Sequence, residues 1–306
     1  MFNPYSFQRH IHDIAQPQNL PFLEELRNLC DSYGGRVLLG ELHESEGEKL
    51  HGEYTAPGRL QLAYGYWLLA ADMIDGAVLE RTARSLGYAL DDGWPCWAID
   101  NHDFTRSGTR LGRSRPPVAL LCALTCLRGA MCLYQGAELG LGEADIPFDR
   151  LRDPYGREFY PSYLGRDGAR TPMPWDASIE HCGFSDTEPW LPISEAHRAL
   201  AVSAQDTKPG STLNRVRQFL HWRKGIQPIR AGEQQFVDLG EGLLALRRTL
   251  ERDGVLCVFN LSDAERRFEL PEEELGTPMT GHGFSFLRSG GTITLAPDEA
   301  YFGELA

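Results

Sequence analysis

The chain has 306 residues, of which 42% are hydrophobic and 24% are charged, and its formal net charge is −13. This composition is ordinary for a globular protein with a substantial core, and the length suits one large α/β domain with a smaller one. The acidic balance argues against a nucleic-acid partner, because such proteins need a basic patch and none is visible.

The sequence carries no apparent signal peptide or membrane-spanning segment. Its first residues, MFNPYSFQRH, lack the basic start and apolar core of a signal peptide. The longest apolar run, VALLCALTCL at 118–127, has the length of a buried helix and is too short to span a bilayer. The seven cysteines form no Cys-x-x-Cys pair, and several lie in apolar runs. This usage favours buried free thiols in a reducing compartment, so we expect a cytoplasmic protein without a membrane partner.

The first predicted elements are a helix and a strand. In the segment 21–35, apolar residues recur at helical spacing and a Gly-Gly pair ends the run, which predicts an amphipathic helix. The next segment, RVLLGE at 36–41, is a short apolar run of strand length that ends in Glu41. The apolar and aromatic stretch 59–69 follows, and it leads into a helical stretch that extends to about Leu86.

Two further apolar runs and a helix continue this alternation. PCWAIDNHD at 95–103 is a short apolar run that ends in charge, and AMCLYQGAELG at 130–140 is a third strand that ends in polar groups. Between them, 116–129 is a helix with proline at its start and glycine at its end. Alternating helices and strands predict a parallel sheet, and runs that are apolar throughout fit strands covered on both faces. In a (β/α) barrel the catalytic groups follow the carboxyl ends of such strands.

The amino-acid composition changes in the second half of the chain. Residues 142–192 are rich in proline, glycine and aspartate but also in aromatic residues and arginine, which predicts a long structured loop. The segment 211–225 predicts a helix with Ser211 as its cap. Short strand-like runs with turns follow and predict a small β-sandwich-like domain. We therefore expect two domains, at 1–231 and 232–306.

Ionisable residues directly after the predicted strands are the candidates for catalysis. Glu41 follows RVLLG, although a carboxylate there could also begin a solvated loop. His102 and Asp103 follow the run CWAI and belong to a cluster of ionisable groups. Two carboxylates from separate strand ends of one barrel could meet over the same pocket, where one donates a proton and the other stabilises positive charge.

Two other clusters compete with this interpretation. In some barrel hydrolases a His-x-His pair, such as His10 and His12, binds a metal ion. There the pair normally ends an apolar strand, whereas here the segment NPYSFQR, which is not a strand, precedes it. The stretch 166–175 brings Arg166 and Arg170 close to Asp167, and a salt bridge within a loop would explain that pattern without any function.

Taken together, several stretches resemble one family. LLGE at 38–41, NHD at 101–103, YQGAELG at 134–140 and GRDGARTPMPW at 165–175 occur in the order and approximate spacing of the α-glucosidase branch of the α-amylase superfamily, glycoside hydrolase family 13. HIHDIAQP and PFLEELRNL near the start of the chain also resemble that branch. The resemblance extends over essentially the whole sequence.

The resemblance implies roles for three residues at the strand ends. Glu41 resembles the general acid/base at the end of the fifth barrel strand. Asp103 resembles the aspartate that stabilises the transition state at the end of the seventh strand, and His102 resembles the histidine that hydrogen-bonds the sugar. A retaining glycosidase passes through an oxocarbenium-like state between a proton donor and a carboxylate nucleophile.

The same resemblance implies four further substrate-binding residues. Arg170 corresponds to an arginine that helps to bind the terminal glucose, and Arg166 is the second candidate for that role. Trp67 and Tyr134 are expected to line the pocket.

The nucleophile of this family is missing from the sequence. In the family it is an aspartate at the end of the fourth strand, within a motif of the type Gly-Phe-Arg-x-Asp, and no such motif occurs here. The expected fold is therefore α/β: the second half of a (β/α)8 TIM barrel, about strands 5 to 8, followed by a small C-terminal all-β domain.

Three functional hypotheses follow from these motifs. The first is a retaining α-glucosidase that acts on maltose-like oligosaccharides, with or without transglucosylation, and needs no cofactor or metal. The second is a non-catalytic fragment or subunit that requires an N-terminal barrel half as its partner. The third is the metal-dependent hydrolase built on His10 and His12.

Overall fold

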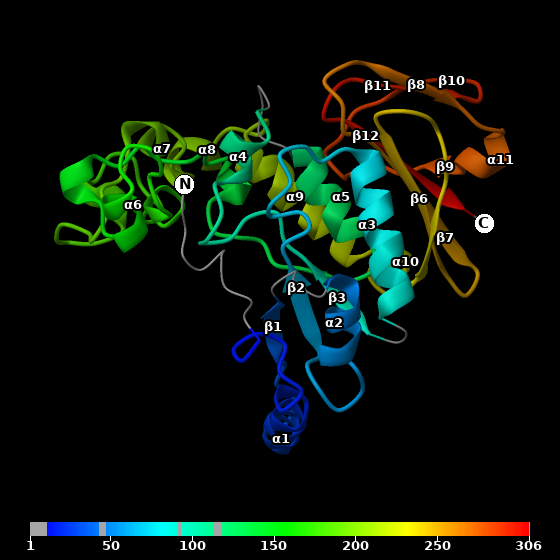
Figure 1. Cartoon of the computed structure of the whole chain (residues 1–306). Helices are drawn as coiled ribbons and strands as arrows, with labels where there is room; N and C mark the ends of the chain where they lie inside the picture. Colours follow the sequence, from blue (N-terminus) through cyan, green and yellow to red (C-terminus); the bar gives the residue numbers. More distant parts are fainter. Residues whose placement is uncertain (1–10, 43–46, 91–92, 113–117, 306) are drawn as a thin grey trace.

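The computed structural model describes residues 11–42, 47–90, 93–112 and 118–305. Helices pack beside a parallel sheet in the first part of the chain, a lobe of short helices extends to one side, and antiparallel sheets form the last part (Figure 1). No helix within these ranges is both long enough and apolar enough to cross a membrane.

Four strands form the parallel sheet, in the order in which they occur along the chain. They are β1 (Leu39–Leu42), β2 (Leu62–Gly65), β3 (Trp94–Trp97) and β4 (Ala130–Met131). The predicted parallel sheet is therefore confirmed, but the strand predicted over 130–140 is much too long. The backbone N–H of Cys132 still bonds to the carbonyl of Trp97 at 2.8 Å, and the chain then turns at Gly136, whose φ of +88° is left-handed.

The helices of this first part agree with the predicted pattern, with two additions. The predicted helices appear as α1 (Asn19–Ser32), α3 (Gly76–Ala89) and α5 (Val118–Cys126). Asp75 caps α3 by accepting a hydrogen bond from the backbone N–H of Val78 at 2.8 Å, which sets where the helix begins. The additional helices are α2 (Gly47–Tyr54) and the short α4 (Ser107–Arg110), which no sequence pattern had indicated.

Short helices make up the predicted loop region and its continuation, and they form the lobe in Figure 1. A small apolar cluster of Ala144, Ile146, Leu151 and Leu191 holds the two ends of the segment 142–192 together. The short helices after β4 are η3 (Ala137–Leu139), η4 (Phe148–Arg150), α6 (Pro154–Glu158), η5 (Asp167–Ala169), η6 (Glu180–Gly183), α7 (Glu195–Ala199) and α8 (Val202–Asp206).

Helix α9 (Thr212–Lys224) leads into the last part of the chain, and Ser211 caps it through the backbone N–H of Asn214, as predicted. After α10 (Gln227–Ala231) come a five-stranded sheet in the order β5-β6-β7-β12-β9 and a three-stranded sheet in the order β10-β11-β8. Their elements are β5 (Glu233–Phe236), β6 (Leu243–Leu250), β7 (Asp253–Asn260), β8 (Arg266–Glu269), α11 (Glu272–Leu275), β9 (Thr277–Pro278), β10 (Leu287–Ser289), β11 (Thr292–Leu295) and β12 (Ala300–Leu305).

The largest apolar core joins the two parts of the chain. Side chains of α3 and α5 pack in it together with Phe219 of α9 and with Phe259 and Phe302 of the five-stranded sheet. A second core lies between the two antiparallel sheets and includes Val258, Ile293 and Tyr301. Because the first core is shared, the division at residues 231 and 232 stays a prediction.

Candidate active site

Four residues in or just beyond the four parallel strands form a polar cluster. Glu41 lies on β1 directly opposite Tyr64 of β2 in the strand register. Asn101 follows β3, and Cys132 follows β4. Burial and then the Glu41 carboxylate raise the pKa values of both Tyr64 and Cys132, and Tyr64 also interacts with Asn101. The four residues are therefore near neighbours at the carboxyl ends of the strands.

Asn101 connects the two candidate carboxylates. Its Nδ2 donates a hydrogen bond to Oε1 of Glu41 at 3.1 Å. Its Oδ1 accepts hydrogen bonds from the backbone N–H groups of Asp103 at 2.9 Å and Phe104 at 3.1 Å. One buried amide thus orients the Glu41 side chain and fixes the turn on which Asp103 is placed.

The loop that carries Asp103 is fixed at its base as well. The carboxylate of Asp100 accepts a hydrogen bond from the Ser107 hydroxyl at 2.6 Å and a second one from the Ser107 backbone N–H. Nη2 of Arg110 donates to the carbonyl of Ile99 at 2.6 Å. These contacts close residues 100–107 into a compact loop, so Asp103 occupies a defined position.

Two arginines from a distant segment bind the carboxylate of Asp103. Its Oδ1 lies 3.1 Å from Nη1 of Arg166 and 2.7 Å from Nη2 of Arg170. Arg170 also donates through Nε to the carbonyl of His102 at 2.8 Å. The predicted salt bridge within the loop 166–175 is therefore wrong in its acidic partner, because both arginines reach Asp103 and Asp167 does not pair with them. Binding of a terminal glucose by these arginines stays a prediction.

Asp153 determines the direction of Arg166. Its carboxylate is fully buried and accepts hydrogen bonds from the Arg166 backbone N–H and Nε, both at 2.9 Å. Burial alone would raise the pKa of Asp153, but the hydrogen bonds from Arg166 lower it overall. The side-chain hydrogen bond to Asp153 is also the main reason why the pKa of Arg166 is raised, and the negative charges of Asp153 and Asp103 add to this effect.

His102 and Tyr134 lie at the edges of this arrangement. The side chain of His102 is about half exposed, at 52%, and its Nε2 lies 3.6 Å from Oδ1 of Asp103. Tyr134 donates through its hydroxyl to the carbonyl of Ala169 at 3.0 Å, which ties it to the turn between the two arginines. Contact of either residue with a sugar stays a prediction.

Arg106 is a buried support that the sequence did not indicate. Only 1% of it is exposed. Its guanidinium donates to the carbonyl of Gln135 at 2.7 Å and to that of Ala169 at 2.9 Å, and it stacks on the Tyr134 ring at 5.0 Å. Its backbone N–H donates to Glu143 at 2.9 Å. Arg106 thereby joins the Asp103 loop to the segment that carries Arg166 and Arg170.

The structure places Trp67 beside α2, and its contact with a sugar stays a prediction. Its ring stacks on His51 of α2 at 5.1 Å, packs against the largest core, and occupies the space beside Gly65. Tyr64 and Tyr66 also lie near the carboxylates, and the Tyr66 ring contacts Phe104 beside Asp103 at 5.0 Å.

The described part of the chain contains no set of side chains that would support the metal hypothesis. Within these residues, no three or more His, Cys, Asp and Glu side chains form a group that could hold a metal ion. His10 lies outside the described residues, whereas His12 is exposed in a turn. All seven cysteines are free thiols, and all of them except Cys132 are buried.

Sequence and structure comparisons agree on one family. The family model for the α-amylase catalytic domain matches residues 3–232. A probable α-glucosidase of Rhizobium meliloti is 38% identical over 99% of this chain and 56% of its own length. Maltase A2 of Drosophila melanogaster is 30% identical over 75% of this chain and 39% of its own length.

Solved structures give the same result. The α-glucosyl transfer enzyme XgtA has a TM-score of 0.90 and 41% identity, and the match covers 99% of this chain and 57% of that one. The isomaltulose synthase SmuA from Protaminobacter rubrum, at 20% identity and a TM-score of 0.80, shares the fold.

The chain spans about half the length of the curated relatives that it matches. Its parallel sheet with surrounding helices and its C-terminal antiparallel sheets are consistent with the TIM barrel and all-β domain of the family fold. With a family model that matches most of its residues and relatives that align over nearly all of it, this chain belongs to the α-amylase family, in its α-glucosidase branch.

Proposed function

We propose that this chain contributes the proton-donating side of the active site of a retaining α-glucosidase, with Glu41 as the general acid/base and Asp103 as the carboxylate that stabilises the transition state. The observation that carries the proposal is the position of Asn101, which hydrogen-bonds the Glu41 side chain and the Asp103 backbone at once. The names of the relatives support an action on α-linked glucose.

The proposed reaction uses the two carboxylates in different ways. Glu41 donates its proton to the glycosidic oxygen as the bond from that oxygen to C1 of the glucose breaks. Asp103, oriented by Arg166 and Arg170, stabilises the positive charge that develops on the sugar ring. In the second step Glu41 takes a proton from water, whose oxygen bonds to C1 as the bond from C1 to the nucleophile breaks.

Between these steps a carboxylate nucleophile must bond to C1 and hold the glucosyl group. No Gly-Phe-Arg-x-Asp motif occurs in the sequence, so we propose that the nucleophile comes from residues outside it, in a segment that completes the barrel. As part of the same proposal, this chain supplies about strands 5 to 8 of the barrel.

Glucosyl transfer is the second candidate for the overall reaction. The specific observation in its favour is the 41% identity to a structure described as an α-glucosyl transfer enzyme. The chemistry at Glu41 is the same, because a sugar hydroxyl replaces water as the group that loses a proton. Product analysis with maltose as donor and acceptor separates the two reactions.

Complementation tests the proposed division of the site. The chain alone should not hydrolyse p-nitrophenyl α-glucoside, because no glycosyl-enzyme can form without a nucleophile. A chimera that adds the unmatched part of the Rhizobium relative should restore turnover. Activity of the chain alone that equals the chimera would refute the proposal, and an inactive but folded chimera would favour a non-catalytic subunit.

Two variants of that chimera assign the carboxylates. Glu41→Gln should lose about 10² to 10⁴ in rate on maltose but much less on an aryl glucoside, whose good leaving group departs without protonation. Asp103→Asn should reduce both rates alike, because Asp103 acts on the charge of the sugar ring. Glu25→Gln, an exposed change on α1, is the matched control and should leave both rates unchanged. Equal losses on both substrates for Glu41→Gln would remove it from the acid role.

A further inference from the structure

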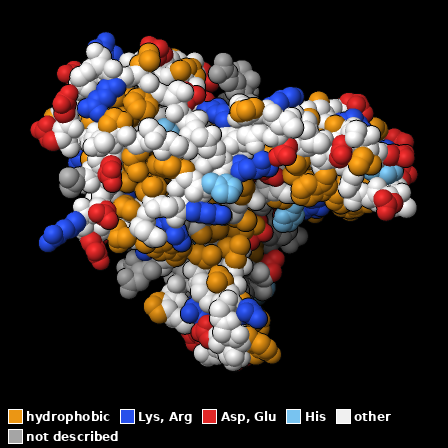
Figure 2. Space-filling model, turned by 180° about the vertical axis from the view of Figure 1, so that it is seen from behind, with side chains coloured by type: hydrophobic (Ala, Val, Ile, Leu, Met, Phe, Trp, Pro, Cys, Tyr) orange, Lys and Arg blue, Asp and Glu red, His pale blue; other side chains and the backbone are white. Residues whose placement is uncertain are grey.

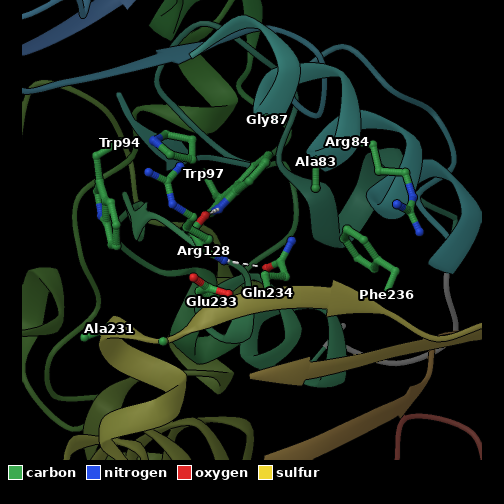
Figure 3. Close-up of a pocket in the computed structure, with 12 residues that line it drawn as sticks. Ala83, Arg84, Gly87, Trp94, Trp97, Arg128, Ala231, Glu233, Gln234 and Phe236 are labelled. Carbon is green, nitrogen blue, oxygen red and sulfur yellow. Dashed lines mark hydrogen bonds between the residues drawn. The ribbon is translucent and has the colours of Figure 1, made fainter. Parts of the chain in front are cut away.

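A second pocket, of about 530 Å³, lies at the end of the parallel sheet opposite to Glu41 (Figure 3). It opens beside Trp94, where β3 begins, whereas Asn101 and Asp103 follow the other end of that strand. One wall is formed by Arg84 and Gly87 of α3, and the opposite wall is formed by the start of β5. The pocket is therefore separate from the candidate active site.

The floor of this pocket is held rigidly by hydrogen bonds. The backbone N–H of Arg128 donates to Oε1 of Gln234 at 2.6 Å, and the indole N–H of Trp97 donates to the carbonyl of Arg128 at 3.0 Å (Figure 3). The next residue, Gly129, has a φ of +134°, and a Cβ there would lie 2.6 Å from the carbonyl oxygen of Pro95. A ligand would thus meet a preformed surface and would need to order little of it.

Two aromatic rings of the lining each have a guanidinium group over one face. The Arg128 guanidinium lies over the Trp94 ring at 4.7 Å, and that of Arg84 lies over the Phe236 ring at 4.9 Å. Nη2 of Arg84 is also paired with Glu80 at 2.7 Å.

Several polar groups of the lining have no partner of their own. Within the described ranges, neither Arg128 nor Glu233 has an ion-pair partner, and no hydrogen bond engages the Trp94 indole N–H or Nε2 of Gln234. The pocket therefore offers several donors and one carboxylate acceptor beside aromatic surface.

From these groups we propose that the pocket is a second carbohydrate site, which binds a short neutral oligosaccharide of the maltose type. Sugar hydroxyls both donate and accept hydrogen bonds, which suits Arg128 and Gln234 together with Glu233. The C–H face of a pyranose ring carries partial positive charge and packs on an aromatic face. An anionic ligand fits less well, because the Glu233 carboxylate lines the same space. This site goes beyond the proposed function, since it uses neither Glu41 nor Asp103.

Binding of maltotriose to the whole chain tests the proposal, with calorimetry for affinity and the NMR signal of the Trp94 indole N–H for location. We expect saturable binding with a Kd on the order of 1 mM, accompanied by a shift of that signal. Arg128→Ala should weaken binding about tenfold or more. Gly87→Trp should do the same by filling the pocket, because nothing lies within 4 Å of a Cβ at Gly87.

Matched controls separate this site from the candidate active site. Gly87→Ala adds only a methyl group, and Asp103→Asn alters only the other site, so both should keep the Kd within about twofold. Circular dichroism confirms that each variant is folded. The proposal is overturned if maltotriose fails to bind at about 50 mM, if Gly87→Trp binds like Gly87→Ala, or if inorganic phosphate shifts the Trp94 signal and maltotriose does not.

Discussion

Strands β1 and β7 differ in how many strands they pair with and in how deeply their side chains are buried. β7 lies between β6 and β12, and every residue of it after Asp253 is buried. β1 pairs only with β2 in the described sheet, and Leu42 is its one buried residue. Among the residues that the structure describes, the apolar cluster beside β1 contains four buried ones, whereas the largest core includes side chains from both parts of the chain.

This difference bears directly on the candidate site. Glu41 comes from the weakly supported β1, while Asp103 comes from a loop fixed by Asn101, Arg166 and Arg170. Apolar side chains at the weak edge remain exposed, including Val37 at 61% and Leu39 at 47%. Figure 2 shows a broad apolar area on the rear face, above the projection that α1 forms. The two carboxylates therefore depend on parts of the molecule that differ in stability.

Truncation of one side chain in each region should show the largest contrast. Phe302→Ala removes a fully buried ring that packs on Trp222 at 4.8 Å and on Phe259 at 5.4 Å. It should lower the free energy of unfolding by about 3–5 kcal/mol. Leu39→Ala at the exposed edge should change that free energy by less than about 0.5 kcal/mol. Urea denaturation measures both, and equal losses would show that β1 is as well supported as β12.

Acid should weaken the β1 side through His51. Burial lowers the pKa of His51 from an ordinary 6.5 to about 4, and neither ring nitrogen makes a well-formed hydrogen bond, although the Ala63 backbone offsets part of the burial effect. Between pH 6.5 and 4 the unfolded chain binds a proton that the folded chain does not, so stability falls as the pH falls. The loss should approach about 3 kcal/mol at pH 4.

Unfolding of wild type and His51→Phe by urea at pH 7 and pH 4.5 measures this contribution. The variant should lose less stability between the two pH values, because it lacks the titrating ring. His221→Phe is the control, since that histidine is exposed on α9 and should leave the pH dependence unchanged. A wild-type slope retained in His51→Phe would contradict the assignment.

Removal of single helix caps should have the smallest effect on stability. It compares a helix that packs in the largest core with a short helix of the lobe. Ser211 caps α9, whose Phe219 is in the largest core, and Ser194 caps the short helix α7 of the lobe. Ser211→Ala should cost about 1 kcal/mol of global stability. Ser194→Ala should mainly increase amide exchange within the lobe, because local opening need not unfold the core. A larger global loss for Ser194→Ala would mean that the lobe and the core unfold together.

Local sequence patterns indicated α1, α3, α5 and α9 and the existence of the parallel strands, but they missed α2 and made the strand at 130–140 too long. Apolar runs that end in charge placed Glu41 at the end of a strand and Asp103 after one, because buried strands must emerge into solvent at polar residues. The cap at Ser211 was equally readable, since it depends on a hydrogen bond to a residue three positions away. The family motifs added the assignment to the α-glucosidase branch, which the comparisons bear out.

Only the tertiary structure decided which side chains meet. Arg166 and Arg170 bind Asp103 across 63 and 67 positions of sequence, and Asp153 directs Arg166 from inside the lobe. Tyr64 reaches Glu41 through the register of β1 and β2, which no single-strand pattern specifies. Such contacts depend on the packing of whole elements against one another, whereas helix and strand formation depends largely on neighbours along the chain.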